Sequence, residues 1–199
     1  TEAGRVDDVH PAQVDHDMPA HLGHVPQRRA QASIDPTPAY PFGHGLSYTT
    51  FDWSDATVVE PREDPTAWPV DGEVRVRITV ANTGERAGTE VVQLYLHDPV
   101  AQTTRPVVRL IGYTRLPLAA GEVAHVTFGV PADVASFTGL TGRRIVEPGD
   151  VELRFGLSSG EVAAALPLRL VGTERQVGFE RELLTSVWVE PLVAVAQSA

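Results

Sequence analysis

The chain of 199 residues contains no cysteine and no lysine, and its single asparagine is Asn82. Without cysteine it can form no disulfide, no thiolate metal site and no cysteine nucleophile. All 16 basic side chains are therefore arginine, which we interpret as a feature of the coding sequence rather than of a site. Asn82 is followed by Thr83 and Gly84, so the sequence lacks an acceptor for N-glycosylation.

Positive charge is scarce as well. The 16 basic residues face 26 acidic ones, giving a net charge of -10 that repels phosphate backbones and anionic lipids. We therefore predict no nucleic acid and no membrane partner, the more so because no run approaches the roughly 20 apolar residues of a membrane span. A start at Thr1 without a signal peptide leads us to expect a piece of a longer protein, cytoplasmic or secreted.

From Phe51 onward, short alternating runs separated by turn residues predict β-strands. The clearest run, at 73–80, places four aliphatic side chains on one face and charged or hydroxyl side chains on the other. With no helical period, the pattern favours two packed antiparallel sheets of about seven strands. Pro167 cannot donate a ladder hydrogen bond, so we predict that its strand lies at an edge or contains a bulge. The predicted strands are 51–60, 73–80, 90–97, 107–115, 122–130, 151–157 and 162–171, with a possible further strand at 186–190.

Changes in composition divide the chain into four parts. Residues 1–38 are polar, lack a periodic face, and are predicted to be irregular. Residues 39–55 form a glycine-containing junction, 56–172 the β-sandwich, and 173–199 a tail.

The junction has the most distinctive sequence, in which two glycines lie between aromatic residues and a proline. Gly43 and Gly45 can adopt positive φ, and Pro41 fixes its own φ. Phe42, Tyr48 and Phe51 are expected to anchor the segment. We predict a fixed connection to a neighbouring domain, made by residues Tyr40, Pro41, Phe42, Gly43, Gly45, Leu46, Tyr48 and Phe51.

Five phrases, in one order, resemble the C-terminal region of glycoside hydrolase family 3, which includes β-glucosidases. They are 80–84 with the turn Asn82-Thr83-Gly84, 88–99 with the strand Gln93-Leu94-Tyr95, the strand 109–116, the glycine-glutamate turn in 118–128, and the closing hairpin of 147–149 and 156–159. The junction resembles the entry to this region. The resemblance covers about residues 39–190. It implies an immunoglobulin/fibronectin type III-like antiparallel β-sandwich.

The resemblance also implies an accessory role. In this family the nucleophile and the acid/base come from a barrel and an α/β sandwich, which are the implied partners and are absent here. No carboxylate of this chain lies in a matching motif, so we predict no catalytic residue, no cofactor and no activity of the chain alone. Asp52, Asp55, Asp98 and Asp133 are interpreted as turn, cap or surface residues.

Two other constellations favour ordinary structural roles. His44, Ser47 and Asp52 are triad residue types, but triads are recognised by geometry, which sequence proximity does not supply, and we favour packing at the junction. The early histidines and aspartates hold metal-ligand atoms without a helical i, i+4 pair or a second fixed element, so we predict no metal site. They are His10, His16, His21 and His24 with Asp7, Asp8, Asp15 and Asp17.

The tryptophans Trp53, Trp68 and Trp188 could stack on sugar rings, but we favour core or interface anchoring. Two alternatives to the accessory domain stay open: an independent carbohydrate- or protein-binding module, and a decayed gene fragment. We further hypothesise that the segment upstream of about Ser33 is a frameshift product, because it lacks the apolar alternation that the family has there.

Overall fold

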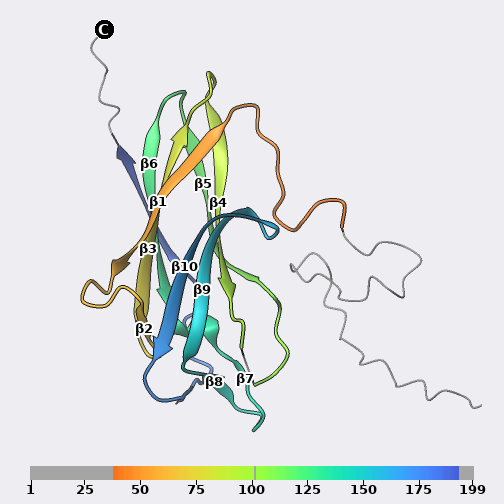
Figure 1. Ribbon diagram of the computed structural model, residues 1–199, viewed down its shortest axis with the longest axis vertical. Helices are drawn as coiled ribbons and strands as arrows, with labels where there is room; N and C mark the ends of the chain where they lie inside the picture. Colours follow the sequence, from red (N-terminus) through yellow and green to blue (C-terminus); the bar gives the residue numbers. More distant parts are fainter. Residues whose placement is uncertain (1–37, 101, 193–199) are drawn as a thin grey trace, which may run out of the picture.

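Two β-sheets face each other in the computed structural model, which describes residues 38–100 and 102–192 (Figure 1). No helix of these residues is long and apolar enough to cross a membrane. The first sheet has the order β1-β3-β6-β12 and consists of β1 (Phe51–Glu60), β3 (Glu73–Asn82), β6 (Val123–Pro131) and β12 (Ser186–Leu192). The second has the order β2-β10-β9-β4-β5 and consists of β2 (Ala67–Pro69), β10 (Glu161–Val171), β9 (Gly149–Ser158), β4 (Gly88–His97) and β5 (Arg109–Leu118).

A smaller sheet closes one end of the sandwich. It consists of β11 (Arg175–Gln176), β8 (Arg144–Val146) and β7 (Phe137–Thr138), next to the 3₁₀ turn η2 (Ala132–Ala135). These elements are only two to four residues long. They are too short for a periodic pattern, so the sequence did not reveal them, and the same holds for β2.

Alternation along β3 and β6 explains why these residues form the inner face of the first sheet. Val76 pairs with Phe128 in the antiparallel register, and Ile78 pairs with Val126. All four side chains are fully buried, while Arg77 between them faces outward. The predicted division of residues 73–80 into an aliphatic inner face and a polar outer face is confirmed.

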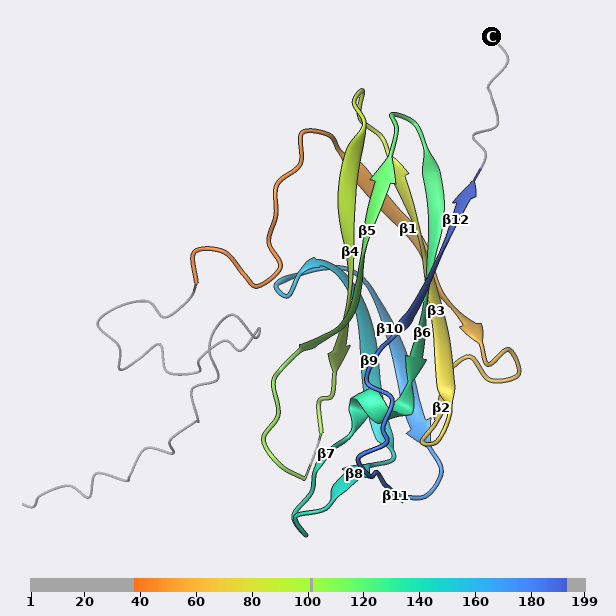
Figure 2. The same ribbon diagram turned by 180° about the vertical axis from the view of Figure 1, so that it is seen from behind.

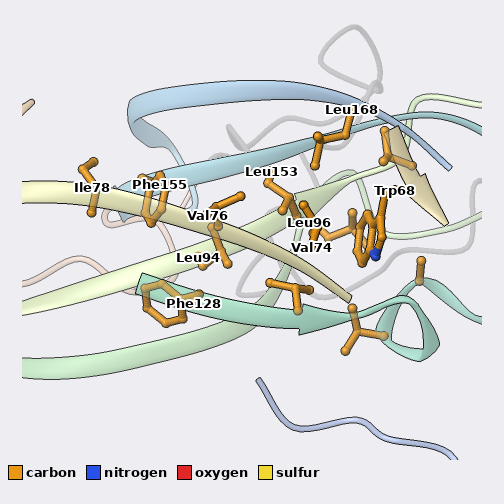
Figure 3. Close-up of a cluster of buried hydrophobic side chains, with 14 of the residues drawn as sticks. Trp68, Val74, Val76, Ile78, Leu94, Leu96, Phe128, Leu153, Phe155 and Leu168 are labelled. Atoms are coloured by element: carbon orange, nitrogen blue, oxygen red, sulfur yellow. The ribbon is translucent and has the colours of Figure 1, made fainter. Parts of the chain in front are cut away.

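Side chains from both sheets meet in a single core (Figure 3). Phe128 of β6 contacts Phe155 of β9 with ring centroids 6.0 Å apart and the planes tilted by 54°. Trp68, from the short strand β2, is fully buried at the end of this core. Burial of apolar surface between the sheets is the main stabilising contribution in such a fold.

The structure confirms the predicted β-sandwich and each of the seven predicted strands. The possible tail strand is also present, since β12 pairs with β6 along its whole length. Pro167 lies at an open edge, because β2 pairs with β10 only over residues 169–171. The proposed domain limits stay predictions: the limit at residue 55 falls inside β1, and residues 1–37, with the frameshift hypothesis and the early histidines, lie outside the described residues.

Candidate functional site at the junction loop

Residues 40–50, called the junction loop below, cross the outer face of the second sheet before entering β1. Figure 2 shows this segment running from β1 past β4 to the turn between β9 and β10. Gly43 has φ +83°, and a Cβ atom there would lie 2.1 Å from Oε1 of Gln93. Only glycine fits this close approach, because both the backbone angle and the space exclude a side chain.

Gln93 of β4 fixes the first part of the loop. Its amide Nε2 donates to the carbonyl oxygen of Gly43 at 3.0 Å and to that of Leu157 at 2.9 Å. Its Oε1 accepts a hydrogen bond of 2.6 Å from the hydroxyl of Tyr95, and burial raises the pKa of that hydroxyl to about 12. The backbone N–H of Ser159 donates to the carbonyl of Phe42 at 2.8 Å. The loop therefore covers Gln93 and Tyr95, which are both buried on the outer face of β4.

Asn82 fixes the other end of the loop. Its Oδ1 accepts hydrogen bonds from Oγ1 of Thr49 at 2.8 Å and from the N–H of Gly84 at 3.1 Å. Its Nδ2 donates to the carbonyls of Arg86 at 2.8 Å and Leu118 at 3.1 Å. The side chain is almost completely buried, so each of its polar atoms is satisfied inside the protein. The single asparagine of the sequence thus joins the loop to two turns of the sandwich.

Between these two anchors the loop faces outward. Leu46 is 94% exposed and Tyr48 is 96% exposed, while Tyr40 stacks on His44 at 4.8 Å between ring centroids. Tyr48 therefore does not anchor the loop to the sandwich, contrary to our expectation, because the anchoring comes from backbone carbonyls at Gly43 and Phe42. Gly45 does not have positive φ and has no atom within 4 Å of an added Cβ.

Beneath the loop lies a cavity of about 440 Å³. It is lined by the loop, by β4 and β5, and by the ends of β9 and β10, and most of its lining is apolar. Glu90 is one of the polar residues of the lining. Desolvation raises the pKa of its carboxyl group, and the hydrogen bond of 3.0 Å from the N–H of Val91 offsets this in part. The lining includes Phe42, Leu46, Val91, Leu110, Tyr113 and Leu157.

The carboxylates considered as catalytic candidates have structural contacts. Asp98 forms an ion pair with Arg105, and Asp133 forms one with Arg175. Asp55 adopts φ +53° within β1 and accepts a hydrogen bond from Ser54, and Asp52 is exposed on the same strand.

The three triad residue types are not brought together. Ser47 accepts a hydrogen bond of 3.2 Å from the N–H of Thr49, and the ring of His44 lies on Tyr40. Over residues 38–100 and 102–192 no hydrogen bond joins His44, Ser47 and Asp52, and no cluster of three metal-binding side chains occurs.

The three tryptophans have different surroundings. Trp68 is in the core, and Trp53 is partly buried and packs against the core from β1. Trp188 of β12 is 43% exposed on the outer face of the first sheet. Anchoring is thus the role of two tryptophans, while the third faces solvent.

Comparison with known proteins agrees with this architecture. Residues 90–159 match the fibronectin type III-like domain. The chain is 38% identical over 125 residues to a periplasmic β-glucosidase of Salmonella typhimurium, covering 63% of this chain and 16% of that protein. This chain carries the C-terminal fibronectin type III-like domain of glycoside hydrolase family 3.

Solved structures of the family contain the same fold. The β-glucosidase from Listeria innocua superposes with a TM-score of 0.65 and 30% identity, covering 74% of this chain and 20% of that chain. A GH3 β-glucosidase of Bifidobacterium adolescentis superposes with a TM-score of 0.58 and 31% identity over 66% and 18%. The chain thus spans about a fifth or less of its relatives and matches an accessory part of them.

Sequence reasoning did not assign Asn82, Gln93, Tyr95 and Glu90 to the site. The first three were part of the phrases that carried the resemblance, but their role depends on contacts with residues 33 to 64 positions away. A polar side chain at an inward or covered strand position was the available signal, because such a residue needs a partner.

We expect Gly43→Ala to release the first part of the loop, since alanine is strained at this φ and collides with Gln93. Amide exchange of Ser159, whose N–H bonds to Phe42, should become faster by about tenfold or more, or about 1.4 kcal/mol in local opening free energy. Gly45→Ala is the matched control and should leave this rate nearly unchanged, since its Cβ meets no atom. Equal rates in both variants would contradict the role assigned to Gly43.

We expect Glu90→Gln to stabilise the chain at pH 7. The native state holds the Glu90 proton more tightly than the unfolded chain, so wild-type stability falls as pH rises above the ordinary glutamate pKa. Since Glu90 is only partly buried, the gain in Tm should be a few degrees at most, and it should vanish toward pH 4. Thermal melts between pH 4 and 7 measure it, with Glu161→Gln on the exposed rim of the same cavity as control. A pH-independent difference would show that Glu90 does not titrate as assigned.

Proposed function

We propose that this chain is an accessory domain that packs against the catalytic domains of a β-glucosidase-like glycoside hydrolase. The junction loop and the cavity beneath it form the contact surface. The supporting observation is that Leu46 and Tyr48, two large side chains, project almost fully into solvent from a loop fixed at both ends. Large apolar groups held outward next to an apolar cavity are typical of a surface that a partner covers.

The position of the loop along the chain supports this partner. It precedes β1, so a domain on its N-terminal side reaches the sandwich at this point. Tyr113 of β5, 63% exposed on the same cavity, and Val91 of β4 extend the apolar surface onto the sheet. A partner that covers this surface would also complete the desolvation of Glu90. We therefore expect the partner to place a hydrogen-bond donor next to the Glu90 carboxyl group.

The proposed division of labour leaves catalysis to the other domains. A retaining glycosidase uses two carboxyl groups about 5–5.5 Å apart across the sugar. In the described residues, Asp98 and Asp133 are held by arginines instead. The sandwich would stabilise the enzyme by fixing the orientation of its catalytic domains.

A chimera tests the contact surface. In the Salmonella typhimurium β-glucosidase, the region that this chain matches would be replaced by residues 38–192 of this chain, which include the junction loop and β12. Leu46→Ser with Tyr48→Ser should lower the Tm of the chimera by several degrees, because the two side chains would be buried there. The same pair should leave the Tm of the isolated chain within about 1 °C, since neither side chain is buried in it.

Gln102→Ser, an exposed polar change at the opposite end of the sandwich, is the control in both backgrounds. If the double variant lowers the Tm equally in the isolated chain, the loop residues serve the sandwich itself. If neither background responds, the contact surface lies elsewhere and the proposal fails.

We expect the purified chain to hydrolyse none of a panel of chromogenic aryl β-glycosides. Of its four candidate carboxylates, Asp98 and Asp133 are engaged in ion pairs, while Asp52 and Asp55 lie on β1 with no second carboxylate of the described residues placed to share a sugar. Turnover that disappears when one carboxylate of this chain is changed to its amide would overturn the accessory role.

A further inference from the structure

A second hollow lies on the opposite side of the sandwich, on the outer face of the first sheet. It has a volume of about 530 Å³ and crosses all four strands, from Glu60 on β1 to Trp188 and Glu190 on β12. Three interstrand spacings of about 4.8 Å make it about 14 Å long, which suits a short extended ligand. We call it the Trp188 groove; its lining is Val59, Glu60, Arg62, Arg75, Arg77, Thr127, Trp188 and Glu190.

The indole of Trp188 is held in place without being buried. Its ring atoms lie 3.0 Å from the position of a Cβ on Gly129, so glycine leaves the space that the ring occupies. The guanidinium of Arg75 lies 5.0 Å from the ring centroid, and Glu60 and Glu73 fix that arginine at 3.1 and 2.8 Å. An ordered aromatic surface of this kind, 43% exposed, is available to a ligand without further loss of side-chain freedom.

Polar groups with free hydrogen-bonding capacity surround the indole. Within residues 38–100 and 102–192, the side chains of Arg62, Arg77 and Glu190 form no ion pair and no hydrogen bond. Arginine supplies donors and glutamate supplies acceptors. The groove therefore offers both kinds of group beside an aromatic platform.

We propose that the Trp188 groove binds a pyranose oligosaccharide. A pyranose with equatorial hydroxyl groups has an apolar C–H face that packs on an indole and an equatorial rim of groups that both donate and accept hydrogen bonds. The groove matches both features. A peptide that adds a strand would instead use the free edge of β12, and its main-chain groups would not reach the charged residues on the sheet face.

This site is independent of the junction loop, since it lies on the other sheet. Trp53 and Trp68 cannot serve the same purpose, because both pack into the core. Tyr113 offers an exposed aromatic ring on the second sheet and thus a matched comparison.

The test is isothermal titration of the full chain with β-linked hexasaccharides of glucose and of xylose, whose equatorial hydroxyls leave the ring faces apolar. The wild type should bind at least one of them with a Kd on the order of 1 mM or tighter. Trp188→Ala should weaken binding about tenfold or more, Trp188→Tyr should restore part of it, and Tyr113→Ala should bind like the wild type.

The variant Arg77→Ala distinguishes a loss of binding from a folding defect. Since Arg77 has no pairing partner in the described structure, this variant should lower the affinity for the oligosaccharide without lowering the Tm. Lack of binding to every hexasaccharide, or equal binding by Trp188→Ala and the wild type, overturns the proposal. So does a Tm loss on Trp188→Ala that appears only in the chimera, since the face would then be a domain contact. None of these results bears on Leu46 and Tyr48, so the two proposals fail separately.

Discussion

The side-chain amide of Gln93 is the contact on which the placement of the junction loop depends. One nitrogen joins carbonyl oxygens of two distant segments, at Gly43 and Leu157, to the middle of β4. An irregular segment laid over a sheet must satisfy its backbone carbonyls, and here one glutamine does so for two of them. The hydroxyl of Tyr95 donates a hydrogen bond to Oε1 of the same amide and so holds the orientation of the amide. The loop can therefore leave Leu46 and Tyr48 in solvent and still have a defined path.

The sandwich separates two kinds of surface. The second sheet carries the loop and an apolar cavity, while the first sheet carries charged side chains around Trp188. This separation follows from strand alternation, since each sheet turns one face to a common core and one face outward. An accessory domain with this arrangement can contact its neighbours through one sheet and leave the other free for a ligand.

Strand alternation made most of the fold predictable. The run at 73–80 has one apolar residue at every second position, and all seven long strands were assigned from patterns of this kind. The two- and three-residue strands, β2 among them, were not predicted because two or three residues are too few to show a repeated alternation. Tyr48 does not anchor the loop to the sandwich as expected, since an aromatic residue in a loop looks the same in sequence whether it points inward or outward.

The sequence by itself determined the period of the strands, the positions of the turns and the glycine at residue 43, because these depend on local backbone geometry. Only the tertiary structure decided which polar residues hold the loop, since Asn82 and Gln93 act on segments 33 to 64 positions away. It also separated the three tryptophans into core and surface. Burial is a property of the packed sheets, and a residue type alone does not specify which face it will join.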